Sequence, residues 1–171
     1  QNKIYLEDKL KKYEYEYKFL GEGEEWNGFG TKIKSYQEYI KKNTKLNDED
    51  ILVLIDSRDI YVNRSSKELI EEFKNYYEKN GGDLDKNLKL IFSSELACCT
   101  PGISENDKDK MKFNYLNRNY NLEKKNFYLN SGMCIGYVKA FKRLYLNIEM
   151  NKEDDDQTKI TKYWLNDNSN D

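Results

Sequence analysis

The sequence predicts an α/β domain with a mostly parallel central sheet flanked by helices. Three short apolar runs are typical of buried strands, at residues 51–55, 88–93 and 127–138. Segments with apolar residues at helical spacing separate these runs along the chain. Strands and helices that alternate in this way indicate the α/β class. The chain has 171 residues, which is enough for one domain with its own core.

The N-terminal segments are expected to form a helix, a short strand and a second helix. Residues 3–13 fit the first helix, and residues 17–20 fit a short strand after it. A glycine-rich loop at residues 21–30 interrupts the pattern. Apolar residues then return at helical spacing over residues 32–42, which predicts the second helix.

The strand predicted at residues 51–55 leads to a capped helix. Its five consecutive apolar residues, Ile-Leu-Val-Leu-Ile, indicate a strand that is buried on both faces. Ser65 or Ser66 caps the helix that follows, because serine side chains accept hydrogen bonds from the first free backbone N–H groups. Gly81 and Gly82 end this helix.

The C-terminal half predicts two further strands and two helices. Residues 88–93 form the second strand, and residues 127–138 form the third with a glycine kink. Residues 103–125 are rich in Asn, Lys and Asp, and we expect a mobile surface excursion there. Residues 139–150 fit a helix, and an acidic run caps a last helix that ends near Leu165.

Charge and hydropathy exclude two broad classes of protein. The 29 basic residues nearly cancel the 31 acidic residues, so the chain lacks the clustered basic excess of a nucleic-acid-binding surface. No run approaches 18 apolar residues, so no transmembrane segment is predicted.

No signal peptide is visible, but processing can remove one, so the compartment stays open. The wealth of Asn, Lys, Asp and Tyr suggests a viral or other AT-rich genome.

Histidine and cysteine usage narrows the chemistry further. The chain has no histidine, which excludes Ser-His-Asp catalysis, Cys-His catalysis and histidine-ligated zinc. The three cysteines are Cys98, Cys99 and Cys134, and none belongs to a Cys-x-x-Cys pair. Cys98 and Cys134 could form one disulfide, but buried free thiols are the favoured interpretation.

Two acids follow the apolar run at residues 51–55. Asp56 and Asp59 would lie just beyond the carboxyl end of a strand, where ligands of parallel sheets collect. Two carboxylates there can hold a divalent cation, which in turn can hold phosphates. The alternative is a polar exit from the strand, in which one of the acids caps a turn. This segment alone leaves both interpretations open.

Four polar segments stand out, and each by itself has a simple structural explanation. A plain turn explains the glycine loop, a β-bulge explains Asn-Ser-Gly, and a helix N-cap with favourable dipole placement explains the acidic run. Their order and spacing are more informative than any one of them. The segments are Gly21–Trp26, Asp56–Asp59, Asn130–Gly132 and Asp155–Gln157.

Together these segments resemble the glycosyltransferase domain of the procollagen lysyl hydroxylase/glycosyltransferase family. That family has Leu-Gly-x-Gly-x-x-Trp-x-Gly, Gly-Gln-Lys, Asp-Ser-Tyr-Asp, Phe-Ser-Ala-Glu-x-x-Cys-Trp-Pro, Leu-Asn-Ser-Gly-Gly-x-Ile-Gly and Asp-Asp-Gln in this order. The match covers nearly the whole chain. The corresponding stretches are Leu20–Gly28, Gly30–Lys32, Asp56–Asp59, Phe92–Cys99, Leu129–Gly136 and Asp155–Gln157.

The resemblance implies a GT-A (Rossmann-like) fold, of which residues 1–171 form a single domain without the family's first strand and C-terminal end. It implies a glycosyltransferase that uses a UDP-sugar donor and Mn²⁺ to modify a collagen-like protein acceptor. Transfer of glucose from UDP-glucose to galactosyl-hydroxylysine, with net retention at the anomeric carbon, is the favoured reaction. Family members act in the endoplasmic reticulum lumen and tend to form homodimers.

The resemblance also assigns roles to residues. Asp56 and Asp59 look like the metal-binding pair, and Asp155 and Asp156 like the catalytic acids beside the sugar and acceptor. Mn²⁺ on carboxylates would neutralise the diphosphate, and a lysine nearby would add charge to the same leaving group. The residues that the resemblance assigns to substrate binding are Trp26, Lys32, Arg58, Asn130, Ser131, Gly132 and Gln157.

Three departures from the family pattern keep other functions open. Arg58 replaces a tyrosine, Cys99 replaces a tryptophan, and no histidine follows Asp-Asp-Gln to complete the metal site. The alternatives are a hydroxylysine galactosyltransferase and a non-catalytic nucleotide-sugar-binding or partner-binding module that kept the fold. A metal-dependent phosphatase or nuclease is disfavoured, because such sites gather more carboxylates or histidines around two metals.

Overall fold

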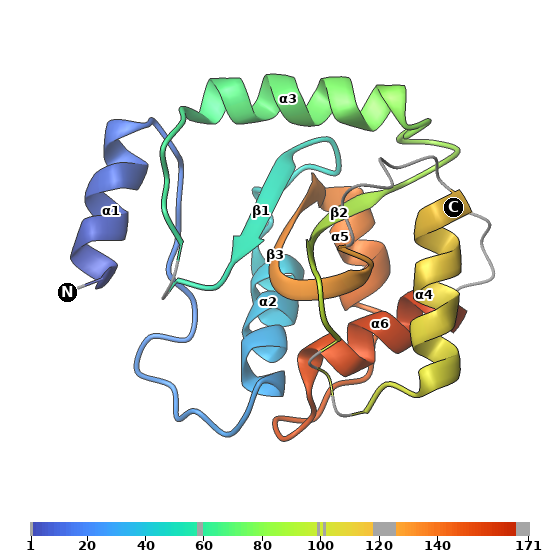
Figure 1. Ribbon diagram of the computed structural model, residues 1–171. Helices are drawn as coiled ribbons and strands as arrows, with labels where there is room; N and C mark the ends of the chain where they lie inside the picture. The colour runs from blue at the N-terminus through green and yellow to red at the C-terminus, as the bar shows by residue number, and fades with distance from the viewer. Residues whose placement is uncertain (1, 58–59, 99, 101, 118–125, 167–171) are drawn as a thin grey trace.

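The computed structural model describes residues 2–57, 60–98, 100, 102–117 and 126–166 (Figure 1). These residues form a small sheet with helices packed around it, which confirms the α/β class. The elements in chain order are α1 (Asn2–Lys12), α2 (Gly30–Lys42), β1 (Ile51–Ile55), α3 (Ser66–Lys79), β2 (Leu90–Glu95), α4 (Glu105–Asn117), β3 (Tyr128–Tyr137), α5 (Val138–Tyr145) and α6 (Asp156–Asn166).

The sequence predicted a mostly parallel sheet, and this prediction was wrong. Its strand order is β1-β3-β2, and β3 runs antiparallel to both neighbours. β1 and β2 therefore point the same way without touching. The prediction failed because a continuous apolar run indicates that a strand is buried but carries no information on the direction of its neighbour.

The main hydrophobic core lies on one face of the sheet, beneath α2, α5 and α6 (Figure 1). Leu54 of β1 pairs with Cys134 of β3, which in turn pairs with Phe92 of β2, and this row faces the helices. Val138 follows β3 directly and begins α5, so the chain turns from the sheet into the core without a loop. The helices contribute Ile33, Tyr36, Ile40, Phe141, Leu144, Tyr145 and Ile160.

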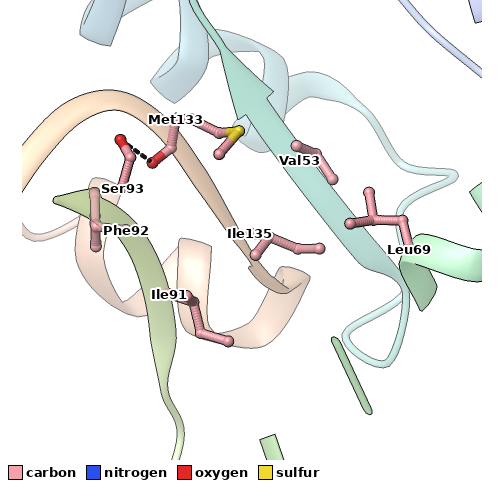
Figure 2. A pocket seen from close by; sticks show the side chains of 7 residues that line it. All are labelled: Val53, Leu69, Ile91, Phe92, Ser93, Met133 and Ile135. Carbon is pink, nitrogen blue, oxygen red and sulfur yellow. Dashed lines mark hydrogen bonds between the residues drawn. The ribbon is translucent and has the colours of Figure 1, made fainter. Parts of the chain in front are cut away.

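The opposite face of the sheet carries an open apolar cavity of about 120 Å³ (Figure 2). Val53, Ile135 and Ile91 form the next row of paired residues, and Leu69 of α3 approaches them from above. Met133 and Ser93 complete the lining, and Phe92, whose side chain packs against the main core, borders it. The Ser93 hydroxyl in this cavity donates to the carbonyl of Met133 at 3.3 Å. This face of the sheet is therefore apolar, and the cavity has few polar groups that could bind a charged ligand.

Helix α3 begins with the predicted serine cap. Ser65 is the N-cap residue, and its hydroxyl accepts a hydrogen bond from the Glu68 backbone N–H at 3.3 Å. The Glu68 carboxylate accepts in return from the Ser65 backbone N–H at 2.9 Å, which makes a capping box. Gly81, just past the helix, has a φ of 73°, a left-handed conformation that glycine adopts without strain.

Two other element predictions were wrong. Residues 17–20 form no strand, because Tyr17 instead donates to Glu7 of α1 at 2.8 Å and packs edge-to-face on Phe19. The expected surface excursion at residues 103–125 contains α4 instead, while residues 118–125 lie outside the described part. The Ser104 hydroxyl accepts from the Asp107 N–H at 3.2 Å, and Met111 is buried against Ile103 and Tyr128. The Ser104 cap and the buried Met111 hold this helix in place.

Helix α5 ends earlier than predicted, at Tyr145. The side chain of Gln37 in α2 donates to the carbonyls of Tyr145 and Ile148, at 2.7 and 2.9 Å. These bonds satisfy carbonyls at the end of the helix, where the chain leaves the helical path. Ile148 and Met150 still pack into the core although they are not helical. Gln37 of α2 therefore binds the last residue of α5 and the segment that follows it.

Cys98 and Cys134 are free thiols, as favoured from the sequence, but of these two only Cys134 is buried, and Cys98 is partly exposed. Cys99 lies outside the described residues. Burial of Cys134 raises its pKa well above the ordinary value of a thiol, so it packs as a small apolar side chain. Among the described helices, none is both long and apolar enough to cross a membrane.

Candidate active site

One polar cluster joins four elements at the end of the sheet. Lys32 comes from the first turn of α2, and Asp56 directly follows β1. Ser131 lies within β3, and Asp156 is the first residue of α6. The sequence analysis had named all four of these residues. Lys32 and Asp156, the two farthest apart along the chain, are separated by 124 positions (156 − 32). The structure brings them into direct contact.

Lys32 lies at the centre of this cluster. Its ammonium Nζ is 2.6 Å from Oδ2 of Asp156 and 3.0 Å from Oδ1 of Asp56, so it bridges two carboxylates. The Lys32 side chain is only 12% exposed. Burial acts to lower the pKa of Lys32, but the charges and hydrogen bonds of Asp156 and Asp56 outweigh burial and hold this pKa above its ordinary value. Lys32 is therefore a charged ammonium within a partly buried site.

Two side-chain contacts and the N-terminus of α6 stabilise the Asp156 carboxylate. Besides Lys32, it accepts a hydrogen bond from the Ser131 hydroxyl at 2.9 Å, and its side chain is 5% exposed. Its place in the first turn of α6 adds the favourable field of the helix N-terminus. A buried carboxylate with charged and hydrogen-bonding partners of this kind has a fixed orientation.

Asp155, in contrast, caps the same helix. Its Oδ1 accepts a hydrogen bond from the Thr158 backbone N–H at 2.7 Å, three residues on, which is the geometry of an N-cap. The structural explanation of the acidic run therefore holds for Asp155. Whether Asp155 is also catalytic stays a prediction.

A shift in strand register places Ser131 in the cluster. Phe92 pairs with Cys134, but the next residue, Ser93, pairs with Asn130, so residues 131–133 bulge away from β2. The backbone N–H of Asp56 donates to the Gly132 carbonyl at 2.8 Å and ties this bulge to the end of β1. Bulges of this kind re-aim side chains beside active sites. The predicted glycine kink is thus confirmed as an irregularity of β3.

The Ser93 hydroxyl fixes the bulge from the β2 side. It lies 3.1 Å from the Asn130 carbonyl and 3.0 Å from Asn130 Oδ1. Asn130 Oδ1 also accepts from the Gly132 N–H at 2.9 Å. A Cβ on Gly132 would meet that oxygen at 2.9 Å, so a glycine fits here where larger residues crowd.

Glu95 is a site residue that the site assignment from sequence missed. Its two carboxylate oxygens accept from two side-chain amides, Asn130 at 3.1 Å and Gln157 at 2.7 Å. Gln157 also donates to Thr100 at 2.9 Å and accepts from the Ser131 backbone N–H at 3.1 Å. The signal was present in the sequence, since Glu95 is the acid of the Phe-Ser-Ser-Glu stretch. Its partners became known only when β2, β3 and α6 were placed together.

We expect Glu95→Gln to lower the free energy of unfolding by about 1–3 kcal/mol. The new amide presents an NH₂ group where both neighbouring amides need an acceptor, so one polar group loses its partner. Urea unfolding followed by circular dichroism measures the change. Glu71→Gln on the exposed face of α3 is the matched control and should stay within about 0.5 kcal/mol. Equal stability of the two variants would show that Glu95 is not a structural link.

The glycines before Lys32 serve packing. A Cβ on Gly30 would lie 1.8 Å from the Asn151 carbonyl oxygen, and one on Gly28 would lie 2.6 Å from that of Lys152. The start of α2 therefore touches the loop that leads into α6. This close approach sets Lys32 of the one helix against Asp156 of the other.

Trp26 lies on the exposed loop before α2 rather than inside the cluster. Its side chain is 60% exposed and packs edge-to-face against Phe29, which is 56% exposed. Two exposed aromatic rings beside a polar cluster can serve as a stacking surface for a ligand. The predicted role of Trp26 in substrate binding stays a prediction.

Comparison with known proteins identifies the family. The family model described as the PLOD GT domain matches residues 4–171. The chain belongs to this family. A Procollagen-lysine,2-oxoglutarate 5-dioxygenase of Drosophila melanogaster is 30% identical over 161 residues, which cover 90% of this chain and 19% of the relative. A Multifunctional procollagen lysine hydroxylase and glycosyltransferase of Caenorhabditis elegans is 24% identical over 168 residues, which cover 94% of this chain and 20% of the relative.

Family membership makes this chain a glycosyltransferase domain, and such a domain implies a nucleotide-sugar donor. The chain spans about a fifth of the length of the two curated relatives. The sequence-based family prediction is thereby confirmed. The finer details of the GT-A fold stay a prediction, since the described sheet has only three strands, all paired antiparallel.

Two predicted site residues of this PLOD GT chain, Arg58 and Asp59, lie outside the described residues. Within the described ranges, no group of three or more Cys, Asp or Glu side chains is placed to hold a metal ion. Asp56 nevertheless suits a cation, because its carboxylate, 41% exposed, already carries the ammonium of Lys32. Asp56 together with Asp59 would be the residues to hold a divalent ion here.

Tyr36 contacts the backbone next to Asp56 from the core side of the sheet. Its hydroxyl donates to the carbonyl of Ile55, the residue before Asp56, at 3.3 Å. Burial raises the pKa of Tyr36 above its ordinary value, and the charges of Asp56 and Asp156 raise it further. Tyr36 therefore stays a neutral hydrogen-bond donor beneath the cluster.

Proposed function

We propose that this protein is a metal-dependent UDP-sugar glycosyltransferase that transfers glucose from UDP-glucose to galactosyl-hydroxylysine of a collagen-like protein. The observation that carries the proposal is the contact of Lys32 with Asp56 and Asp156 in a chain of the PLOD GT family. Phosphate-binding and acidic side chains at one point are what transfer from a nucleotide sugar requires. The name of the Caenorhabditis elegans relative supports a glycosyltransferase that works with lysine hydroxylation.

The donor diphosphate would bind beside Lys32 at the solvent-accessible end of Asp56. Mn²⁺, held by Asp56 and Asp59, would supply positive charge to the diphosphate and favour departure of UDP. Lys32 would add a second positive charge to the same oxygens, because its flexible side chain can follow a phosphate. The carboxylate of Asp56, 41% exposed, is accessible to a metal ion from solvent, and the Lys32 side chain, 12% exposed, lies in contact with it.

The sugar and acceptor would lie toward Asp156 and the amides. Asp156 would orient the acceptor hydroxyl or stabilise positive charge that develops at the anomeric carbon. Ser131 keeps the Asp156 carboxylate in place through its hydroxyl. Glu95 keeps the two amide side chains, Asn130 and Gln157, in one orientation. Fixed polar groups lower the cost of organising the transition state.

A non-catalytic nucleotide-sugar-binding or partner-binding module is the second candidate. Lys32 favours it, because one ammonium already neutralises much of the charge of both carboxylates. Hydroxylysine galactosyl transfer uses the same parts, and the choice between glucose and galactose depends on a few contacts worth about 1–3 kcal/mol each.

The test is calorimetric titration of the protein with UDP, with Mn²⁺ and then with excess EDTA. We expect UDP to bind with Mn²⁺ and binding to be lost with EDTA, because the metal shields the diphosphate. UDP-glucose and UDP-galactose are then compared as donors to peptides that carry hydroxylysine or galactosyl-hydroxylysine. Metal-dependent binding without any transfer would favour the binding module. Absence of UDP binding in both conditions would reject the glycosyltransferase and the nucleotide-sugar-binding module, and would leave the partner-binding module.

A further inference from the structure

The ammonium of Lys32 lies against both carboxylate oxygens of Asp56. It lies 3.0 Å from Oδ1 and 3.3 Å from Oδ2, so it contacts both oxygens of the carboxylate. A divalent cation that bound these oxygens would meet a positive charge at close range. Like charges at such a distance repel strongly in a partly buried site. Metal binding to these oxygens would therefore favour movement of the ammonium away from Asp56.

Lys32 keeps an ion-pair partner, Asp156, when its ammonium moves away from Asp56. Its contact with Asp156 is shorter, at 2.6 Å, and Asp156 is nearly buried whereas Asp56 is not. Asp156 is itself fixed by Ser131. The backbone of Lys32 is also fixed, because Gly30 packs closely on Asn151. A small movement of the side chain is thus enough to release Asp56 while one ion pair remains.

A nucleotide diphosphate would favour that movement. Its oxygens offer Lys32 a second anionic partner in place of Asp56, and they offer the metal further oxygen ligands. A metal ion alone would be repelled by the Lys32 ammonium and would gain no compensating contact. A diphosphate alone would have to compete with Asp56 and Asp156 for the same ammonium. The two ligands together satisfy both cations.

We propose that Lys32 is the resident cation of this site and competes with the metal for Asp56, so that metal and nucleotide diphosphate bind strongly only together. The inference rests on the proposed function and adds its regulation, because it makes the ligand-free site self-neutralised. Reciprocity follows from linkage, since the diphosphate must strengthen metal binding by the same factor as the metal strengthens diphosphate binding.

The experiment measures Mn²⁺ binding without nucleotide, through the electron paramagnetic resonance signal of free Mn²⁺. The variant is Lys32→Gln, whose neutral amide can still donate a hydrogen bond to a carboxylate. We expect it to bind Mn²⁺ about tenfold more tightly than the unchanged protein, within the range usual for coupled sites. With UDP present, the enhancement of Mn²⁺ binding should be smaller in the variant than in the unchanged protein.

Two companion variants separate charge from other effects. Lys34→Gln removes a positive charge from the same helix at a residue outside the cluster, and its Mn²⁺ affinity should stay near that of the unchanged protein. Lys32→Arg keeps the charge and should gain no affinity for Mn²⁺. Circular dichroism reports whether each variant is folded. Tighter Mn²⁺ binding by Lys32→Arg would overturn the proposal even if Lys32→Gln did not fold.

The outcomes for the inference and for the proposed function differ. If the unchanged protein binds Mn²⁺ with UDP but Lys32→Gln binds Mn²⁺ alone no more tightly, the competition is wrong and the function stands. If Lys32→Gln binds Mn²⁺ tightly while the unchanged protein does not bind it even with UDP, Lys32 excludes the metal as proposed, but joint binding with the diphosphate is wrong and the metal-dependent function fails. If neither binds Mn²⁺ in any condition, both are wrong.

Discussion

Replacement of Asp56 by alanine is expected to abolish Mn²⁺-dependent binding of UDP. Asp56 already holds the ammonium of Lys32, and its side chain, 41% exposed, is the more accessible of the two carboxylates that contact this lysine. Loss of residues that merely support metal ligands costs about 10–100-fold in affinity. Loss of a ligand should exceed that, so we expect UDP affinity in the presence of Mn²⁺ to fall by more than about 100-fold. Titration calorimetry with and without EDTA measures the change.

The control for this prediction is Asp85→Ala. The Asp85 side chain is 87% exposed and pairs with Lys139 at 3.3 Å, far along the chain from the cluster. Its removal deletes one surface ion pair, which contributes little to stability. The fold of Asp56→Ala should survive, because Lys32 keeps Asp156 as its partner. Unchanged UDP affinity in Asp56→Ala would reject Asp56 as a metal ligand.

Asp156→Asn is expected to remove sugar transfer while UDP binding changes little. Asparagine has nearly the same shape as aspartate and can still accept a hydrogen bond from Ser131, so the cluster keeps its geometry. The negative charge that would orient the acceptor or stabilise the anomeric centre is lost. Acid–base groups of this kind contribute about 10²–10⁴-fold to turnover, and we expect a loss of that size. Initial rates of UDP release with a galactosyl-hydroxylysine peptide measure it.

Asp155→Asn is the matched variant for this measurement. Asparagine caps a helix as well as aspartate does, so the bond to the Thr158 N–H is preserved. A loss of turnover in Asp155→Asn would support the catalytic role predicted from the sequence, and unchanged turnover would leave Asp155 with its cap alone. Retained turnover in Asp156→Asn would remove Asp156 from the mechanism.

The comparison of sequence and structure differs from element to element. The strand at residues 51–55 and the acid after it were predictable, because five apolar residues followed by Asp56 make a strong local pattern. The cap at Ser65 was predictable for the same reason, since a capping box lies within four residues. Helix α4 was not, because one buried methionine, Met111, gives too little periodicity to detect.

The candidate site was predictable as a set of residue types but not as an arrangement. The resemblance to a family pointed to Lys32, Asp56 and Asp156, and the structure brings these three together. Glu95 escaped the site assignment because its role consists of contacts to Asn130 and Gln157, which lie 35 and 62 positions away. Trp26 shows the opposite case, a residue of the motif that stands exposed outside the cluster.

The sequence by itself determined the family, through the resemblance of its motifs and their order, and it determined the α/β class. It also determined the local elements with clear periodicity or caps, because these signals act over a few residues. Only the tertiary structure decided the antiparallel place of β3, the register shift at Ser93 and the position of the Lys32 ammonium between two carboxylates. Strand direction and ion pairing depend on which distant segments meet. That choice is made by the packing of α2, α5 and α6 against the sheet, and no local pattern encodes it.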